Sequence, residues 1–558
     1  MTETLSGDQA RDIAKEWLEC EPDLKNREEI EALLAGPESE LIQRFTGHLE
    51  FGTAGLRGPL GAGPQRMNRP LVQMTAAAIA QRLLEDDQKE SPLVVIGFDA
   101  RKQSDVFASD TARVLANQNI RCVLLPRALP TPVLAFSVLQ INASAGIMVT
   151  ASHNPRQDNG YKVYWKDGAQ INTPLDKEIS TYLDGIKPNE VKLAPLDSPL
   201  ITFDEGNLLD QYLDMAASCV SKVPDSELKI MYTPIHGVGK DTLIEAFTKS
   251  GFSSVDVVTE QADPDPDFPT VEFPNPEVPG TLDLALAEAK KMHADLVLAN
   301  DPDADRLAVV VPDGETWRTF NGNEIGALLA EHLLRSSEGS DRLVVTTIVS
   351  SRMLKEIAKH HGVHYEETLT GFKWIMRPGI DSREKNFIFG YEEALGFAVG
   401  DHVHDKDGIT SALVFAELAA EAKQQGKSVV DCLHDLWVRH GVHVTGQITH
   451  RFEGSEGADV MMQIMNLIRQ NPPQKIGSCD VEEVTDFLSQ ESGLPPTNAV
   501  ALETGQSRVV VRPSGTEPLI KIYAEVVTPV GDQGVDEAQK LAETELEDAL
   551  KSVSDLLG

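Results

Sequence analysis

Apolar runs of strand length recur along this chain, and amphipathic stretches of helical length separate them. Alternation of this kind is typical of α/β units built on largely parallel sheets. The runs fall in four sets along the chain: 93–100, 121–126 and 146–152; 228–234, 255–260 and 295–301; 342–351 and 386–393; 507–518 and 519–526. A charged helical segment at 535–553 follows the last set. We therefore expect an α/β fold.

The length of 558 residues, at roughly 150 residues per domain, predicts three or four domains. Segments rich in proline or acidic residues fall between the sets and give approximate boundaries. The predicted domains are residues 1–200, 201–318, 319–443 and 444–558. A Pro- and Asp-rich stretch at 261–280 has strand-like runs on both sides, so we expect it to be a long surface loop within the second domain.

The charge balance limits the partners of the chain. Fifty basic and 87 acidic residues give a formal charge of -37, which repels phosphate backbones and argues against nucleic-acid binding. An anionic substrate would therefore need arginines and lysines gathered locally.

The first residues are acidic where a signal peptide is basic, and no segment approaches the ~18 apolar residues of a membrane helix. We expect a cytoplasmic protein with no membrane span.

Five cysteines stand singly in the sequence, without a CxxC pair. Neither a disulfide framework nor a zinc site is indicated.

The loops that begin where apolar strands stop are more informative: TASHNP, NDPDADR, GYEEALG and RPSGTEP carry charged or hydroxyl side chains. Open α/β sheets bind ligands beyond the carboxyl ends of their strands. One loop from each predicted domain could therefore contribute to a common cleft.

The loop after the strand at 295–301 has alternating aspartates, Asp301, Asp303 and Asp305. On extended chain, alternate side chains share a side about 6–7 Å apart. Three carboxylates suit a hard cation, most obviously Mg²⁺. An EF-hand loop would need glycine and glutamate where Arg306 and Pro312 stand, so the calcium loop is excluded. The alternative is a solvated acidic turn that caps a helix.

Ser152 follows another strand, in the sequence MVTASHNPR. Its ordinary role would be a helix N-cap or a turn before Asn154 and Pro155. A reactive role is favoured because His153 and Lys162 could handle protons and the aspartates could hold a metal. The G-x-S-x-G elbow of hydrolases is absent. A serine that carries phosphate, neutralised by Mg²⁺, fits better than acyl transfer.

Seven motifs in one order resemble those of the α-D-phosphohexomutase superfamily, the phosphoglucomutases and phosphomannomutases: GTAGLRG, TASHNP, DPDADR, TGFKWI, GYEEALGF, DKDG and RPSGTEP. The similarity runs from about Gly52 to Glu525. It implies four domains around a central cleft: three with mixed, mostly parallel α/β sheets and a smaller C-terminal α+β domain.

The resemblance also assigns roles to residues near the phosphoryl group. Ser152 matches the serine that is phosphorylated in the active enzyme, and its phosphate would bind Mg²⁺ together with Asp301, Asp303 and Asp305. Three cationic residues match positions at the transferred phosphoryl group: Arg57, Lys162 and Arg306. Among them Lys162 is the candidate general acid or base, with His153 close to it.

Other matches concern the sugar and its second phosphate. Glu392 matches the residue that reads sugar hydroxyls, and Lys373 and Lys406 fall in substrate-facing loops. The loop that grips the phosphate not being transferred is matched by Arg512, Ser514, Gly515 and Thr516.

One departure concerns substrate specificity. Classical phosphoglucomutases have GEES where this chain has YEEA, so Ala394 replaces a serine that would touch sugar hydroxyls. The EEA and DKDG motifs are similar to those of the branch with phosphopentomutases, glucose-1,6-bisphosphate synthases and bacterial phosphoglucomutases.

The resemblance implies reversible conversion of α-D-glucose 1-phosphate to glucose 6-phosphate, through a phosphoserine enzyme and a sugar 1,6-bisphosphate that is both intermediate and activator. The expected partner is a small phosphosugar, and no oligomeric state is predicted. Phosphomannomutase and phosphopentomutase are the alternatives within the superfamily. A metal-dependent sugar phosphatase and a non-catalytic sugar-phosphate binding protein are the alternatives outside it.

Overall fold

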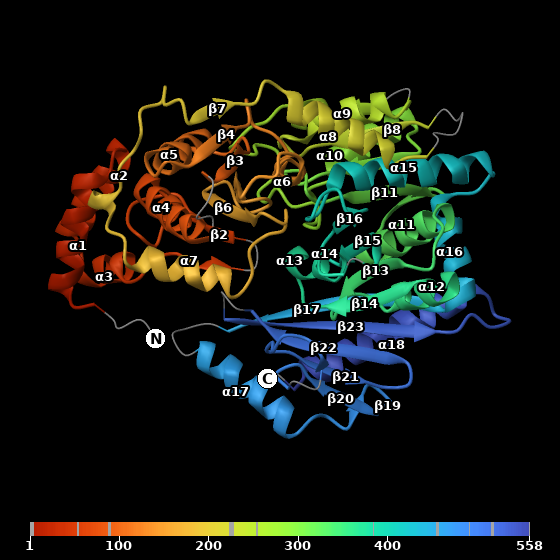
Figure 1. The fold of residues 1–558 in the computed structure, drawn as a ribbon. Helices are drawn as coiled ribbons and strands as arrows, with labels where there is room; N and C mark the ends of the chain where they lie inside the picture. The colour runs from red at the N-terminus through yellow and green to blue at the C-terminus, as the bar shows by residue number, and fades with distance from the viewer. Residues whose placement is uncertain are drawn as a thin grey trace. The chain divides into compact units, whose positions relative to one another are not determined.

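The computed structural model describes residues 5–52, 55–86, 91–221, 228–252, 255–382, 384–452, 457–489, 492–514 and 518–556 (Figure 1). The chain forms two compact units. The first unit contains Met1–Thr319 and Gly396–Glu417, and the second contains Phe320–Leu395 and Leu418–Gly558.

Three short helices open the first unit: α1 (Gly7–Cys20), α2 (Leu24–Ala35) and α3 (Glu38–Phe45). The first begins at a capping box, in which Ser6 Oγ accepts from the backbone of Gln9 and the Gln9 side chain accepts from the backbone of Ser6. The Trp17 and Phe45 rings meet edge to face, with centroids 6.4 Å apart. This packing places the helices on the same apolar core as the sheet that follows them.

The first sheet of this unit has the strand order β1-β2-β6-β5-β3-β4-β7. Its strands are β1 (Phe51–Gly52), β2 (Gly55–Pro59), β3 (Leu93–Phe98), β4 (Arg121–Leu124), β5 (Ala145–Val149), β6 (Asp158–Trp165) and β7 (Ile201–Phe203). Strands β5, β3, β4 and β7 run parallel, while β6 and β2 are antiparallel to their neighbours. The sheet's helices are α4 (Arg69–Asp86), α5 (Ser104–Asn117), α6 (Thr131–Gln140) and α7 (Leu175–Asp184), with the 3₁₀ turn η1 (Pro188–Glu190).

A second sheet in the same unit has the order β12-β11-β10-β8-β9. Its strands are β8 (Ile230–Thr233), β9 (Val255–Val257), β10 (Leu296–Ala299), β11 (Ala308–Asp313) and β12 (Thr316–Thr319). The helical elements are α8 (Asn207–Ser218), α9 (Gly239–Lys249), η2 (Thr259–Gln261) and α10 (Asp283–Met292). Residues 262–282 form the long loop expected between strands of this domain.

A later part of the chain also belongs to the first unit. Strand β16 (Gly396–Val399) forms a bridge between Gly396 and Arg306, and helix α15 (Gly408–Gln424) begins in this unit. The hydroxyl of Tyr212 donates to both oxygens of Asp407, which precedes α15 and accepts from two of its first backbone N–H groups. These bonds fix the DKDG segment against the second sheet's domain.

The second unit begins with a group of elements around parallel strand pairs. Strand β13 (Arg342–Thr347) pairs in parallel with β14 (His364–Thr368) and with β15 (Asn386–Glu392). The helices are α11 (Gly322–Ser336), α12 (Met353–His361), α13 (Phe372–Ile375), α14 (Arg377–Ile380) and α16 (Val429–His440).

The last part of the second unit is an antiparallel sheet in the order β17-β23-β22-β21-β20. Its strands are β17 (Val442–Arg451), β20 (Glu483–Asp486), β21 (Val500–Glu503), β22 (Ser507–Pro513) and β23 (Leu519–Thr528). A small hairpin of β18 (Lys475–Ile476) and β19 (Cys479–Asp480) and helices α17 (Gly457–Gln470) and α18 (Val535–Ser554) complete it.

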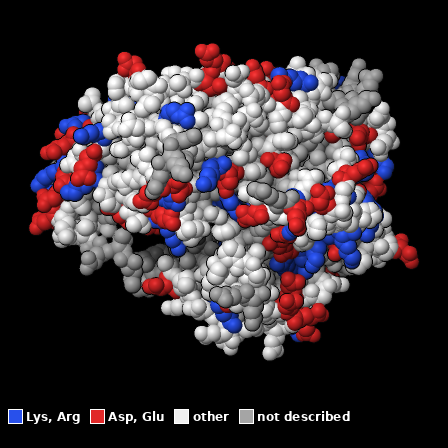
Figure 2. Space-filling view, in the orientation of Figure 1, with Lys and Arg blue, Asp and Glu red and all other residues white. Residues whose placement is uncertain are grey.

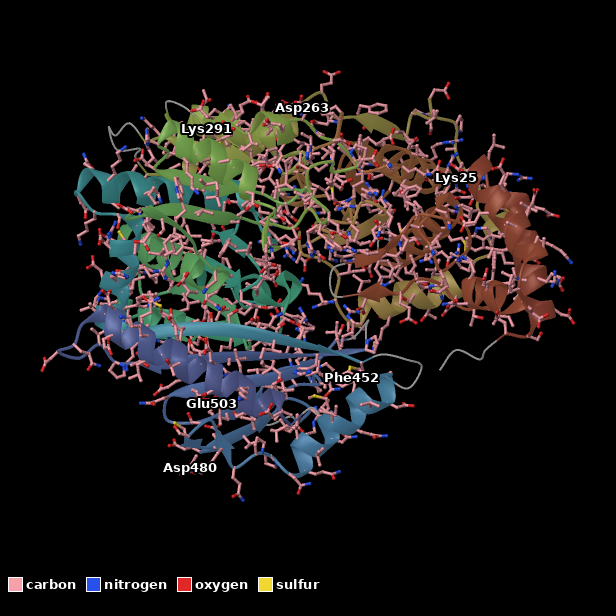
Figure 3. The ribbon with its side chains drawn as sticks, turned by 180° about the vertical axis from the view of Figure 1, so that it is seen from behind. Lys25, Asp263, Lys291, Phe452, Asp480 and Glu503 are labelled. Carbon is pink, nitrogen blue, oxygen red and sulfur yellow. The ribbon has the colours of Figure 1, made fainter. Side chains whose placement is uncertain are left out.

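Alternation along β22 gives this sheet two buried faces. Val509 and Val511 belong to the core that includes residues of α17 and α18, whereas Val510 packs with Ile348 and Leu369. Arg352 and Arg508 both form ion pairs with Glu503, which ends β21 and is labelled in Figure 3.

The predicted class, mixed α/β sheets followed by a smaller α+β domain, is confirmed. The predicted boundaries at residues 200, 318 and 443 stay predictions.

Figure 2 shows acidic and basic side chains interspersed over one face of the molecule. Among the helices in the described ranges, none has the length and hydropathy required to cross a bilayer.

Candidate active site

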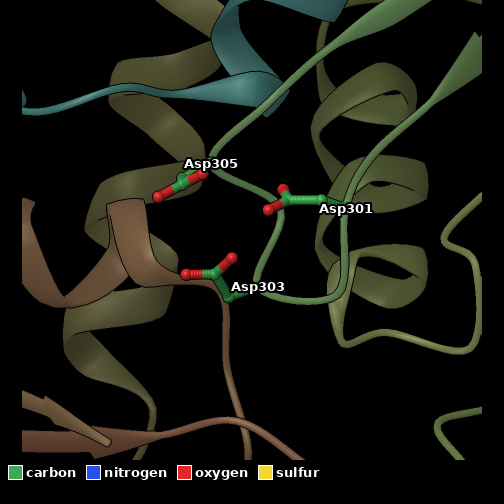
Figure 4. A group of neighbouring side chains, drawn as sticks. All are labelled: Asp301, Asp303 and Asp305. Carbon is green, nitrogen blue, oxygen red and sulfur yellow. The ribbon is translucent and has the colours of Figure 1, made fainter. Parts of the chain in front are cut away.

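The aspartate loop connects β10 to β11 in the first unit. Ala304 has a left-handed backbone, with φ 55°, and its N–H donates to the carbonyl of Asp301 over 2.9 Å. This turn curls the loop, so that Asp301, Asp303 and Asp305 point into one space (Figure 4). All three are fully buried, and one carboxylate oxygen from each lies within 4.8 Å of the others. The alternating spacing therefore does bring the carboxylates together.

Two neighbouring segments hold the loop from outside. The backbone N–H of Thr131 donates to the Asp303 carbonyl over 2.9 Å, and Thr131 Oγ1 donates to Asp303 Oδ2 over 2.5 Å. On the other side, Val238 N–H donates to the carbonyl of Pro302 over 2.9 Å. Gly237 permits this approach, because a Cβ there would lie 2.4 Å from Pro302 Cα. The turn of residues 236–239 thus supports the aspartate loop.

Lysines from two other segments enter the carboxylate cluster. Lys162 Nζ, on β6, lies 2.7 Å from an oxygen of Asp303 and 2.7 Å from one of Asp305, and Lys406 Nζ lies 3.2 Å from Asp305. Burial acts to lower the pKa of Lys162, but the two carboxylates outweigh it and raise that pKa. The Lys162 ammonium is therefore charged at neutral pH.

The carboxylates differ in their pKa values. Burial together with the charges of Asp303 and Asp305 raises the pKa of Asp301 well above its usual value. For Asp305 burial acts in the same direction, but Lys162, Lys406 and Arg306 hold its pKa well below the usual range. Like charges in one buried site repel one another, so this cluster favours a cationic partner.

Two oxygens in the cluster remain for such a partner. Asp303 Oδ1 and Asp305 Oδ1 are buried and have no hydrogen-bond partner among the described residues. A buried, unpaired carboxylate oxygen is costly, and Mg²⁺ is a hard cation that is bound by such oxygens. The residues present therefore fit a divalent, oxygen-ligated cation.

Ser152 lies beside this cluster, in the turn after β5. Its backbone is left-handed, with φ 50°, and its side chain is buried. The Oγ atom donates to Asp301 Oδ2 over 2.7 Å and lies 3.1 Å from His153 Nδ1. Burial and the charges of Arg306 and Arg57 lower the pKa of His153 well below its usual value. A neutral imidazole therefore faces the serine hydroxyl.

Two arginines border the same space. Arg57, on β2, donates from Nη1 to Asn154 Oδ1 over 3.2 Å, and its buried Nε has no hydrogen-bond partner in the described part of the chain. Burial lowers the pKa of Arg57, against the opposing effect of Asp303 and Asp305. Arg306 donates its backbone N–H to Asp301 Oδ1 over 3.0 Å, and its Nη1 lies 3.2 Å from Glu277 Oε2. Local cationic groups are thus gathered in an acidic protein.

The predicted site residues divide between the units. The first unit brings together nine residues of the prediction: Arg57, Ser152, His153, Lys162, Asp301, Asp303, Asp305, Arg306 and Lys406.

The remaining predicted residues lie in the second unit. Lys373 is in α13, Glu392 ends β15, Arg512 is in β22 and Ser514 follows it, with its N–H bonded to the Leu519 carbonyl over 2.8 Å. Gly515 and Thr516 lie outside the described residues. The roles of all these residues, and the shared cleft, stay predictions.

Several residues contact the site in addition to those predicted from the sequence. Asp99 and Arg101 directly follow β3 at its carboxyl end, so the rule that singled out the other loops could have found them. Thr150 begins the TASHNP loop, but its residue type does not predict which group it binds, and Thr131 belongs to no motif. Thr131 is the first residue of α6, where a threonine is usually structural, and only the fold shows that it binds Asp303.

Comparison with known proteins finds one family of proteins along most of the chain. Models of the phosphoglucomutase/phosphomannomutase family match their α/β/α domains I, II and III at residues 48–190, 210–314 and 321–440, and their C-terminal domain at 465–543.

Two curated relatives and one solved structure illustrate the similarity. A protein of Haemophilus influenzae named "Probable phosphomannomutase" is 41% identical over 464 residues, which cover 82% of this chain and 92% of that protein. A phosphoglucomutase of Staphylococcus aureus strain USA300 is 35% identical over 524 residues, 90% of this chain and 94% of that protein.

The open-form structure of pp63/parafusin, a phosphoglucomutase from Paramecium, superposes with a TM-score of 0.70. It is 19% identical, and the match covers 91% of this chain and 95% of that one. The shared fold and the four matched domains agree with the ordered motifs of the sequence. The chain belongs to the phosphoglucomutase/phosphomannomutase family, and it is a phosphohexomutase.

Proposed function

We propose that this phosphohexomutase is a phosphoglucomutase, which interconverts α-D-glucose 1-phosphate and glucose 6-phosphate through a phosphorylated Ser152. The observation that carries the proposal is the position of the Ser152 hydroxyl, buried 2.7 Å from Asp301 in a cluster of three aspartates. A serine with only a structural role in the turn would not need to contact this cluster.

The reaction proceeds in two transfers. The phosphoserine P–O bond breaks as the phosphorus bonds to the free hydroxyl oxygen of a sugar monophosphate, which loses its proton while Ser152 Oγ regains one. The resulting sugar bisphosphate then returns its other phosphoryl group to Ser152. Chemistry of this kind depends mainly on positioning and on charge neutralisation.

Residues of the first unit suit these steps. Neutral His153, with Nδ1 3.1 Å from Ser152 Oγ, is placed to exchange the proton of that oxygen. Lys162 is held in its charged form by Asp303 and Asp305, so it acts as a proton donor or as a positive charge beside the phosphoryl group. Arg57 and Arg306 add further positive charge. Mg²⁺ held by Asp301, Asp303, Asp305 and the phosphate on Ser152 would neutralise charge on the transferred group.

Substrate binding is proposed for the second unit and the DKDG segment. Glu392, Lys373 and Lys406 would contact the sugar and its phosphate. The loop that would hold the phosphate not being transferred contains Arg512, Ser514, Gly515 and Thr516. Support for these roles comes from the positions of the motifs within a chain of this family.

The preference for glucose rests on the Staphylococcus aureus phosphoglucomutase, whose match covers more of the chain than that of the Haemophilus influenzae relative. The higher identity of the latter, named a phosphomannomutase, makes mannose 1-phosphate the second candidate substrate.

A substrate panel tests the proposal. Glucose, mannose, glucosamine and ribose 1-phosphates would be compared by kcat/KM in the presence of Mg²⁺ and a sugar 1,6-bisphosphate. Glucose 1-phosphate should give the highest value and glucose 6-phosphate as product. A higher value for another sugar would contradict the proposed substrate, and release of free phosphate in place of the isomer would indicate a phosphatase.

A further inference from the structure

Arg101 is a buried arginine whose side chain binds the turn that carries Ser152. Its side chain is 2% exposed. Nη2 donates to the backbone carbonyls of Ser152 and Asn154, both over 2.6 Å, and Nη1 donates to those of Pro155 and Asp158 over 2.9 and 3.1 Å. A planar guanidinium with donors fixed in a fork can hold several acceptors at once. One side chain thus fixes the chain from Ser152 to Asp158.

Asp99 holds the same turn from its other end. Its Oδ2 accepts from Thr150 Oγ1 over 2.6 Å, and its Oδ1 accepts from the backbone N–H of Arg101 over 3.0 Å. Thr150 Oγ1 in turn accepts from the backbone N–H of Ser152 over 2.9 Å. Both backbone polar groups of Ser152 are therefore bound, the N–H through Thr150 and the carbonyl by Arg101.

The conformation of Ser152 explains why such binding is needed. A left-handed backbone is unfavourable for a non-glycine residue, and it persists only where the surroundings over-determine it. Ser152 adopts this conformation with φ 50°. From it, Oγ reaches Asp301 on the aspartate loop. Without its bound N–H and carbonyl, we expect the turn to relax and Oγ to leave the carboxylate cluster.

A second segment closes the outer side of the guanidinium. The Phe268 ring lies with its centroid 5.1 Å from Arg101 Cζ, and this ring is buried within the 262–282 loop. The neighbouring residues Lys102 and Asp267 also form an ion pair between the same two segments. Cation–π contact with this ring favours a guanidinium at this position.

We propose that Arg101 is a positioning residue for phosphoryl transfer, which holds Ser152 in its left-handed conformation so that Oγ faces the aspartate cluster. The inference rests on the proposed role of Ser152 as the phosphoryl carrier. Arg101 acts through the backbone of the turn, so its loss should lower the rate of transfer and leave sugar-phosphate binding nearly unchanged.

The test compares Arg101→Lys with a matched variant, Arg342→Lys. Arg342 is also buried and also donates to four backbone carbonyls, those of Gly339, Leu334, Ser337 and His361. None of these acceptors belongs to a predicted site residue. Both variants lose comparable hydrogen bonds, so a purely structural role predicts equal consequences for activity.

The measurements would be made at a temperature at which circular dichroism shows both variants to be folded. Steady-state kinetics would give kcat and KM, and mass spectrometry would give the rate at which glucose 1,6-bisphosphate phosphorylates Ser152. For Arg101→Lys we expect both rates to fall roughly 10- to 100-fold, the effect of misplacing a reacting atom by about 1 Å, with KM nearly unchanged. Arg342→Lys should stay close to wild type in both.

If Arg101→Lys does not fold, Thr150→Val serves as the second variant, since it removes the group that binds the Ser152 N–H; the same fall in kcat is expected. Equal kcat values for the Arg101 and Arg342 variants, or a normal kcat for Thr150→Val, would overturn this inference and leave the proposed function intact. A wild-type enzyme that never carries phosphate on Ser152 would overturn the proposed function as well.

Discussion

The hydroxyl of Ser152 donates to Oδ2 of Asp301 over 2.7 Å, across 149 positions of sequence. This bond joins the turn after β5 to the loop after β10, and thus links the first sheet of the unit to the second. Both segments follow the carboxyl end of a strand, where open α/β sheets present ligand-binding loops. A phosphoryl group on Ser152, as proposed above, would therefore lie beside the three aspartates.

Replacing Ser152 by alanine tests this placement most directly. We expect kcat for glucose 1-phosphate to fall at least roughly a thousand-fold, since removal of a covalent nucleophile commonly costs this much or more. The fold should be intact, because only one side-chain oxygen is lost. Activity would be measured with Mg²⁺ and glucose 1,6-bisphosphate, and folding by circular dichroism. Near-normal turnover in a folded variant would rule out the phosphoserine mechanism.

Thr131→Val tests the support of the aspartate loop. The change removes the hydroxyl that donates to Asp303 Oδ2 and keeps the side-chain shape. Groups that orient a metal ligand commonly contribute 10- to 100-fold to metal affinity, so the Mg²⁺ concentration for half-maximal activity should rise roughly tenfold or more. Thr75→Val is the control, because the Thr75 hydroxyl donates only to Leu71 within α4. The same Mg²⁺ requirement in both variants would count against a role for Thr131.

The sequence predicted those parts of the site that depend on local pattern. The loops of Ser152 and of the three aspartates each follow an apolar run, and their residue types indicated the chemistry. The helix expected at 535–553 is α18, Val535–Ser554. Periodicity and strand ends are local signals, so a single sequence is enough to read them.

Other features depend on residues that meet only in the fold. The carbonyl of Ser152 accepts from Arg101, and the charge state of Lys162 follows from Asp303 and Asp305. The helices of residues 7–45 carry no catalytic motif, and their packing on the core of the first sheet also depends on the fold. Such pairings join positions far apart in sequence, and no local pattern specifies them.

Lys162→Met should expose the balance of charge in the carboxylate cluster. Lys162 binds Asp303 and Asp305 with no exposure to solvent, and removing one partner of a buried ion pair costs about 3–5 kcal/mol. We therefore expect a lower melting temperature than wild type in EDTA. Added Mg²⁺ should restore part of the loss, because a bound cation replaces the missing positive charge.

Thermal unfolding of the Lys162 variant would be followed with and without Mg²⁺. Lys249→Met is the control, since the Lys249–Asp214 pair is largely exposed and exposed pairs contribute little to stability. The expectation fails if the Lys162 variant melts like wild type in EDTA, or if Mg²⁺ leaves its melting temperature unchanged.

The pH dependence of the second unit should reflect Glu525. This buried carboxylate accepts from Ser351 Oγ and from the backbone N–H and Nε of Arg352, and it lies 2.9 Å from His443 Nδ1. Burial alone would raise its pKa, but His443, Arg352 and Ser351 outweigh burial and lower the pKa from 4.5 to about 2. The folded state therefore favours the ionised form.

Between pH 4.5 and about 2 the unfolded chain binds a proton at Glu525 that the folded chain does not. Stability from this group is thus complete above pH 4.5, roughly 3 kcal/mol, and is lost as the pH falls through that window. Glu525→Gln should be less stable at pH 7 and should lose less stability between pH 4.5 and 3 than wild type, measured by urea unfolding. Glu547→Gln, at an exposed position of α18, should follow wild type. An unchanged slope for Glu525→Gln would mean that this carboxylate does not contribute to the acid sensitivity of the fold.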